Sequence, residues 1–183
     1  MFSVHPDCRA KRGVSKENGK RSARPEISLR ARALQYLARR EYSRAELRGK
    51  LLPHVQADQD FEQAFNSSGP VNLDALLDDL IARGWLSDER AATQLVHAKR
   101  SRFGMQRITH ELRQKGIAEE LIGAALPELK DSEIEAVRGV WQKKFGALPQ
   151  DAKEKARQMR FLQSRGFGLE VIFQVLRSES DVE

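Results

Sequence analysis

The hydrophobic side chains of this sequence recur with the 3.6-residue period of an α-helix along most of its length. The clearest stripe covers residues 73–81, where leucine and isoleucine occupy positions i, i+3, i+4, i+7 and i+8. A comparable stripe covers residues 29–38. No stretch alternates apolar and polar residues with the β-branched enrichment typical of a strand. The pattern therefore predicts an all-α protein.

Capping residues and helix breakers divide these stripes into separate helices. The hydroxyl of Ser43 is placed to cap Glu46 in a capping box, and the helix that begins there is expected to end at Pro53. Residues 54–70 are polar and close on the breaker run Asn-Ser-Ser-Gly-Pro, so we interpret them as a surface insertion with a short helical turn at most. A second capping box begins at Ser132 and predicts a new helix there.

One stretch of sequence occurs twice, at residues 112–126 and again at residues 162–176, with an offset of 50. The matched positions include Leu112 with Leu162, Lys115 with Arg165, Gly116 with Gly166, Ile117 with Phe167, Ile122 with Ile172 and Leu126 with Leu176. Glycines at 104, 116, 146 and 166 stand at predicted helix ends, where we expect left-handed caps. A period of this length without a catalytic motif indicates a stacked helical array, which usually provides a binding surface.

We therefore predict three tandem three-helix repeats, similar to helix-turn-helix units, in an elongated and curved array. Each unit is too small for a sizeable core of its own, so neighbours must share apolar faces. The predicted segments are a disordered basic tail at 1–25, repeat 1 at 26–86 with the insertion at about 54–70, repeat 2 at 87–130, repeat 3 at 131–178 and an acidic end at 179–183.

The charge of the chain is unevenly distributed. The net charge is +6. Residues 1–24 alone carry seven basic and two acidic residues, so the remainder of the chain is nearly neutral. Within that remainder, residues 51–90 carry a net charge of −6 and residues 91–115 carry +5. Blocks of opposite sign along a helical array can become faces of opposite sign.

The positive block supplies the candidate binding site. Its six cations are Lys99, Arg100, Arg102, Arg107, Arg113 and Lys115, against one acid, Glu111. They lie on two consecutive helices, so they could form one patch for nucleic-acid phosphates or for an acidic protein surface. A solvated helix face is the alternative. The third helix of each unit is mainly apolar or acidic, which disfavours a sequence-specific operator reader.

No pattern of catalytic or metal-binding residues is present. The four histidines have no cysteine or carboxylate at metal-ligand spacing, and neither phosphate-loop nor nucleophile-elbow motifs occur. We therefore expect a non-enzyme without cofactor or metal. The single cysteine, Cys8, favours a reducing compartment, and no apolar run is long enough to cross a membrane. We expect a cytoplasmic monomer that does not contact membranes.

The order and spacing of several fragments resemble the RecX family of bacterial regulators of the RecA recombinase, over about residues 27–178. The stretches that carry the resemblance are Ala38-Arg-Arg-Glu-Tyr-Ser-Arg-Ala-Glu-Leu47, Leu80-x-x-x-Gly84-Trp85-Leu86-Ser87-Asp88-Glu89-Arg90, Arg102-Phe103-Gly104-x-x-Arg107-Ile108-x-x-Glu111-Leu112-x-x-Lys115-Gly116-Ile117 and Phe161-Leu162-x-x-Arg165-Gly166-Phe167.

The resemblance implies a non-enzymatic modulator that binds RecA filaments on DNA and inhibits their recombinase, ATPase and co-protease activities. It also implies a role in DNA repair and the SOS response. A non-specific DNA-binding repeat protein, which would bind single- or double-stranded DNA, is the second hypothesis. A general helical scaffold is the third.

Overall fold

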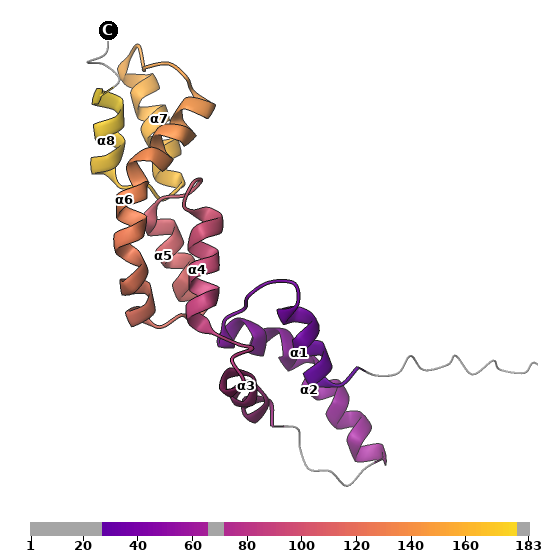
Figure 1. Ribbon diagram of the computed structural model, residues 1–183. Coiled ribbons are helices and arrows are strands. Elements are labelled where there is room, and N and C mark those ends of the chain that lie inside the picture. The colour runs from indigo at the N-terminus through magenta and orange to yellow at the C-terminus, as the bar shows by residue number, and fades with distance from the viewer. Residues whose placement is uncertain (1–26, 66–71, 179–183) are drawn as a thin grey trace, which may run out of the picture.

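The computed structural model describes residues 27–65 and 72–178, and all of its regular structure is helical (Figure 1). The predictions for the tail at 1–25, the breaker run at 66–70 and the acidic end concern residues outside these ranges. The helices are α1 (Leu29–Leu37), α2 (Arg44–Phe65), α3 (Leu73–Ala82), α4 (Asp88–Lys99), α5 (Met105–Gln114), α6 (Glu119–Lys144), α7 (Ala152–Ser164) and α8 (Leu169–Ser178). The all-α prediction is confirmed.

Three hydrophobic clusters follow one another along the molecule. The first joins α1, α2 and α3, the second joins α4, α5 and the first half of α6, and the third joins the second half of α6 with α7 and α8. Figure 1 shows the three groups in an elongated row that bends between α3 and α4. The predicted array of three-helix repeats is therefore confirmed.

Helix α2 contradicts the prediction that Pro53 ends the second helix and that a surface insertion follows. The helix passes through Pro53 and ends at Phe65. Leu47, Leu51 and Val55 are all buried, so the apolar stripe continues beyond the proline. Pro53 itself is exposed, and nothing surrounds Gly49 four residues earlier. Gly49 is also exposed, so its carbonyl, which loses its hydrogen-bond donor to the proline, can bind water instead.

Helix α6 corrects a second boundary. A separate helix was predicted to begin at Ser132, but residues 119–144 form one helix that serves both repeat 2 and repeat 3. The Ser132 hydroxyl donates to the Glu128 carbonyl at 2.9 Å within this helix and does not cap a new one. Pro127 is exposed, and Gly123 stands open four residues before it, as Gly49 does before Pro53. The expected repeat boundary at residues 130 and 131 therefore falls inside a helix.

The helix-end glycines behave as predicted with one exception. Gly116, Gly146 and Gly166 have φ angles of +70°, +66° and +85°, in the left-handed region that favours glycine. Gly104 does not, because its φ is −76° and it occupies the N-cap position of α5. A glycine is required at 104 for a different reason, which lies in the packing of repeat 2 against repeat 3.

Candidate functional site

Repeats 2 and 3 meet through a direct backbone contact at the start of α5. The Gly104 N–H donates to the Arg165 carbonyl at 3.0 Å, and the Gln106 N–H donates to the Gly166 carbonyl at 3.2 Å. A Cβ at Gly104 would overlap the Gly166 carbonyl group. A Cβ at Gly166 would lie 2.6 Å from the Arg107 nitrogen. The two glycines therefore permit an approach that side chains would prevent.

A buried carboxylate completes this junction. Helix α5 has no capping side chain of its own, because Gly104 occupies the N-cap. Glu133 of α6 is 5% exposed, and its Oε1 accepts a hydrogen bond from the Met105 N–H at 3.0 Å. A carboxylate at a helix N-terminus satisfies a free backbone donor and is favoured by the helix dipole. The shared helix α6 therefore also caps α5.

Repeats 1 and 2 meet in the same way but through side chains. The Ser43 hydroxyl donates to the Lys115 carbonyl at 2.5 Å and accepts from the Glu46 N–H at 3.1 Å. The predicted capping box is therefore half formed, because the Glu46 carboxylate does not return to Ser43. It pairs instead with the Lys115 ammonium at 2.7 Å and with Arg40. A Cβ at Gly116 would lie 2.6 Å from the Ala45 Cβ, so this contact is also close.

The Glu46 carboxylate holds the first junction as an ion. Burial alone would raise the pKa of Glu46, but the hydrogen bonds and positive charges of Arg40 and Lys115 outweigh burial and hold its pKa below the ordinary value of 4.5. A second ion pair, from the Arg90 Nε to Glu41 at 2.9 Å, also crosses this junction. Charge therefore contributes strongly to the docking of repeat 1 on repeat 2.

The two junctions are structurally equivalent but differ in charge. Ser43 and Gly104 each precede the second helix of a repeat, and each donates to the carbonyl of Lys115 or Arg165 at the equivalent turn of the next repeat. Three residues after each donor stand Glu46 and Arg107. Where the first junction has a Glu46–Lys115 ion pair, the second therefore has two cations, Arg107 and Arg165.

The six cations of the predicted patch do not act alike. Four are held by carboxylates, in the pairs Lys99–Glu111 at 2.6 Å, Arg100–Glu128 at 2.5 Å, Arg113–Glu119 at 2.6 Å and Lys115–Glu46 at 2.7 Å. Within residues 27–65 and 72–178, Arg102 and Arg107 have no ion pair. The two pack instead on the Phe103 ring, with guanidinium carbons 5.8 and 4.6 Å from its centroid. Arg107 also donates to the Ser164 carbonyl at 3.3 Å.

Comparisons with known proteins identify the family. The model of the second three-helix domain of RecX matches residues 87–126, and that of the third three-helix domain matches residues 131–176. Regulatory protein RecX of Leptothrix cholodnii is 47% identical over 156 residues, which are 85% of this chain and 92% of that protein. RecX of Chromobacterium violaceum is 43% identical over 154 residues, 84% of this chain and 92% of that protein. This chain belongs to the RecX family.

Solved RecX structures share the fold. The crystal structure of RecX from Lactobacillus salivarius has a TM-score of 0.64 at 16% sequence identity, covering 84% of this chain and 96% of that one. A second RecX crystal structure, of 19% identity, has a TM-score of 0.63. The family predicted from the sequence is confirmed, and the relatives are named regulatory proteins.

The structure of this RecX chain adds cations that the sequence prediction missed. Lys143 and Lys144 at the end of α6 and Arg165 directly after α7 have no ion pair among the described residues, and all three line one hollow with Arg102 and Phe161. We call Arg102, Arg107, Lys143, Lys144 and Arg165 the junction cations. The pairing of Lys115 with Arg165 in the internal repeat is the signal in the sequence that could have found Arg165.

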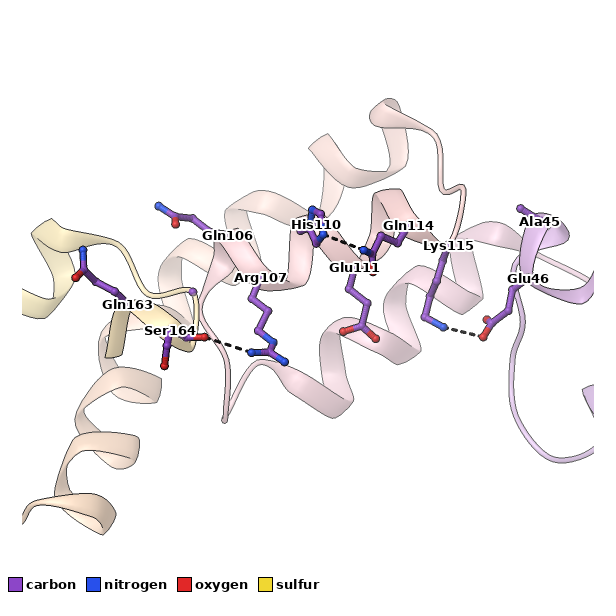
Figure 2. Close-up of a pocket in the computed structure, with 11 residues that line it drawn as sticks. Ala45, Glu46, Gln106, Arg107, His110, Glu111, Gln114, Lys115, Gln163 and Ser164 are labelled. Atoms are coloured by element: carbon purple, nitrogen blue, oxygen red, sulfur yellow. Dashed lines mark hydrogen bonds and ion pairs between the residues drawn. The ribbon is translucent and has the colours of Figure 1, made fainter. Parts of the chain in front are cut away.

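A groove on the other side of the junction spans all three repeats of the RecX chain. Its volume is about 750 Å³, and α5 forms its floor (Figure 2). Glu46 of repeat 1 and Ser164 of repeat 3 stand at its two ends, and the side chains of Gln106, His110 and Gln114 lie between them. A partner segment that lies along α5 would therefore contact every repeat.

The described part of the chain contains neither a candidate metal site nor a candidate membrane span. Between residues 27 and 178, outside the gap at 66–71, no three His, Cys, Asp or Glu side chains gather where they could hold a metal ion. No helix in the same ranges is long and apolar enough to cross a membrane.

Proposed function

We propose that this RecX protein binds RecA filaments on DNA as a monomer in the cytoplasm, and inhibits their recombinase, ATPase and co-protease activities in DNA repair and the SOS response. Membership of the RecX family is the observation that carries the proposal. The elongated row of repeats supports it, because such an array can follow a filament groove and contact successive subunits. No catalytic step is required.

In this proposal the predicted patch contacts the RecA filament. Some of its residues would bind the filament, and others hold the repeats of this chain together. Arg102 and Arg107 have no carboxylate partner in the described ranges, so a partner can engage them without breaking an ion pair. Lys115 is different, because it holds Glu46 across the first junction. Reversing Lys115 would disturb the docking of repeat 1 and would not report on binding alone.

Titration of RecA ATPase activity on single-stranded DNA tests the proposal. Wild-type protein is expected to inhibit, and the Arg102→Glu/Arg107→Glu variant is expected to inhibit at least tenfold less strongly, as loss of two charge-assisted contacts implies. Failure of the wild-type protein to inhibit RecA would refute the function itself.

The matched control is Arg100→Glu/Arg113→Glu, which changes the net charge equally at two patch residues that already have carboxylate partners. It should retain most of the inhibition. Equal loss in both variants, with unchanged circular-dichroism melting curves, would show that net charge and not the free arginines determines binding.

Direct, non-specific DNA binding is the second candidate function, and the unpaired junction cations favour it. Cations that neutralise phosphates release counterions, so the affinity for DNA would fall steeply with salt concentration. Binding of a labelled DNA strand without RecA, measured over a salt series, tests this function. A flat salt response would exclude phosphate contacts as its basis.

A further inference from the structure

A second hollow lies at the junction of repeats 2 and 3, lined by residues 100–102 before α5, by the second half of α6, and by Phe161 and Arg165. Its volume is about 750 Å³, within the range of small-molecule sites. One wall is formed by α6, with Ala136, Gly139 and Val140. Phe161 and Arg165 of α7 form the opposite side.

The charge of this hollow is not balanced by the protein. Arg102, Lys143, Lys144 and Arg165 line it, and none of them forms an ion pair among the described residues. Glu135 is the one carboxylate among its described lining residues. Like charges gathered in this way repel one another and oppose the compact state. A bound anion would relieve that repulsion.

The hollow also presents a flat, aromatic surface beside the cations. The Arg165 guanidinium carbon lies 5.2 Å from the Phe161 ring centroid and 5.5 Å from that of Phe103. The Lys144 ammonium lies 6.0 Å from the Phe161 centroid. The two rings therefore hold the guanidinium in place, and Phe161 packs edge-to-face against Phe145 with a 5.4 Å centroid distance. Aromatic rings and guanidinium planes are the groups on which nucleobases stack.

We propose that this hollow binds a nucleotide unit, with its phosphates on Lys144, Arg165 and Arg102 and its base against Phe161 and the α6 wall. Guanidinium and ammonium groups bind phosphate oxygens through charge-assisted hydrogen bonds. An acidic peptide would satisfy the charges one at a time and would leave the aromatic surface unused. A nucleotide combines several negative charges with one flat ring, which matches both features of the hollow.

Calorimetric titration of the full chain in EDTA, without RecA, tests this site. The probes are ATP, inorganic triphosphate, a thymidine pentanucleotide and a hexaglutamate peptide. ATP or the pentanucleotide should bind more tightly than triphosphate and hexaglutamate, and the tighter of the first two identifies the source as free nucleotide or as a nucleotide within a strand.

Variants locate the binding. Lys144→Gln and Arg165→Gln should each weaken nucleotide binding about tenfold, as loss of one charge-assisted hydrogen bond implies. Phe161→Leu should weaken the nucleotide but not triphosphate. Arg113→Gln is the matched control, because it removes one positive charge that already has a carboxylate partner, and it should leave binding unchanged.

Several results would overturn the proposal. The first is that neither ATP nor the pentanucleotide binds at millimolar concentration. The second is that hexaglutamate or triphosphate binds as tightly as the nucleotides. The third is that Arg113→Gln loses as much affinity as Arg165→Gln. Lys144 is exposed on the surface, so Lys144→Gln remains informative if Phe161→Leu loosens the core. Neither Lys144 nor Phe161 is changed in the RecA experiment, so each proposal can fail without the other.

Discussion

Substitution of Gly104 by alanine tests whether the backbone contact between repeats 2 and 3 holds the array together. The added Cβ would overlap the Gly166 carbonyl and the Phe167 Cα. Both are backbone atoms, so no side-chain rotation can relieve the overlap. The turn between α7 and α8 must therefore move away from the start of α5.

The structure gives the size of the expected loss. The movement weakens two neutral hydrogen bonds, those from Gly104 and Gln106, and the hydrogen bond from Met105 to the Glu133 carboxylate. A neutral hydrogen bond contributes about 0.5–1.5 kcal/mol and one to a charged group about 1.5–3 kcal/mol. Partial relaxation retains some of this, so we expect a loss of about 3 kcal/mol. For a chain of this length, that corresponds to a fall in melting temperature of roughly 6–12 °C.

Thermal and urea unfolding, followed by far-ultraviolet circular dichroism, measure this effect. Gly139→Ala is the matched control, because Gly139 lies inside α6 with nothing within 4 Å of an added Cβ. Alanine is a better helix former than glycine, so the control should gain about 0.5–1 kcal/mol. The two identical substitutions should thus have opposite signs. A melting temperature for Gly104→Ala within about 2 °C of the wild type would refute the reasoning.

Three further predictions concern polar side chains. Glu133→Ala should cost about 1–3 kcal/mol because it leaves the Met105 N–H without its acceptor, whereas Glu133→Gln should cost less, as paired urea melts would show. Gln158→Met should cost a similar amount, because Gln158 accepts from the buried Trp141 indole at 2.7 Å; unfolding followed by tryptophan fluorescence measures it. The stabilising contribution of Glu46 to the first junction is complete above pH 4.5 and is lost as the pH falls through its lower folded pKa. Loss of this contribution should loosen the docking of repeat 1 on repeat 2, so energy transfer between dyes on repeats 1 and 3 should change on acidification. The Glu46→Gln variant should not show this pH-dependent change.

Hydrophobic periodicity and capping residues predicted the helices well where the capping hydrogen bond joins residues close together in the sequence. Ser43 accepts from the Glu46 N–H at 3.1 Å, as the capping box predicted. The failures at Pro53 and at Ser132, which follows Pro127 in α6, share one cause. Both prolines lie on the exposed face of a helix whose buried stripe continues past them, so packing outweighs the local breaker. A rule that ends a helix at every proline, without asking whether the proline lies on the exposed face, cannot recognise a helix that continues.

The candidate site was harder to predict because pairing is a three-dimensional property. Residues 91–115 contain one acid, so the sequence suggested that the cations there were free. Three of the four partners lie outside that stretch, Glu46 in repeat 1 and Glu119 and Glu128 in α6, whereas Lys99 pairs with Glu111 inside it. Conversely, residues 116–183 carry a net charge of −2, yet the fold brings Lys143 and Lys144 into one hollow with Arg102, where Glu135 is the one carboxylate among the described lining residues.

The two junctions differ in the interactions that hold the repeats together and in the side chains that they leave available for binding a partner. The second is held mainly by backbone hydrogen bonds, two glycines and a shared helix. Arg102, Arg107 and Arg165 have no ion pair among the described residues, so a partner can engage them without breaking one. The first combines the hydrogen bond from Ser43 to the Lys115 carbonyl with the Glu46–Lys115 and Glu41–Arg90 ion pairs, and ion pairs near a surface weaken with salt. Amide hydrogen exchange should therefore rise around residues 43–46 between low and high salt, while that of Gly104 and Gln106 stays unchanged. Equal responses at both junctions would show that charge does not distinguish them.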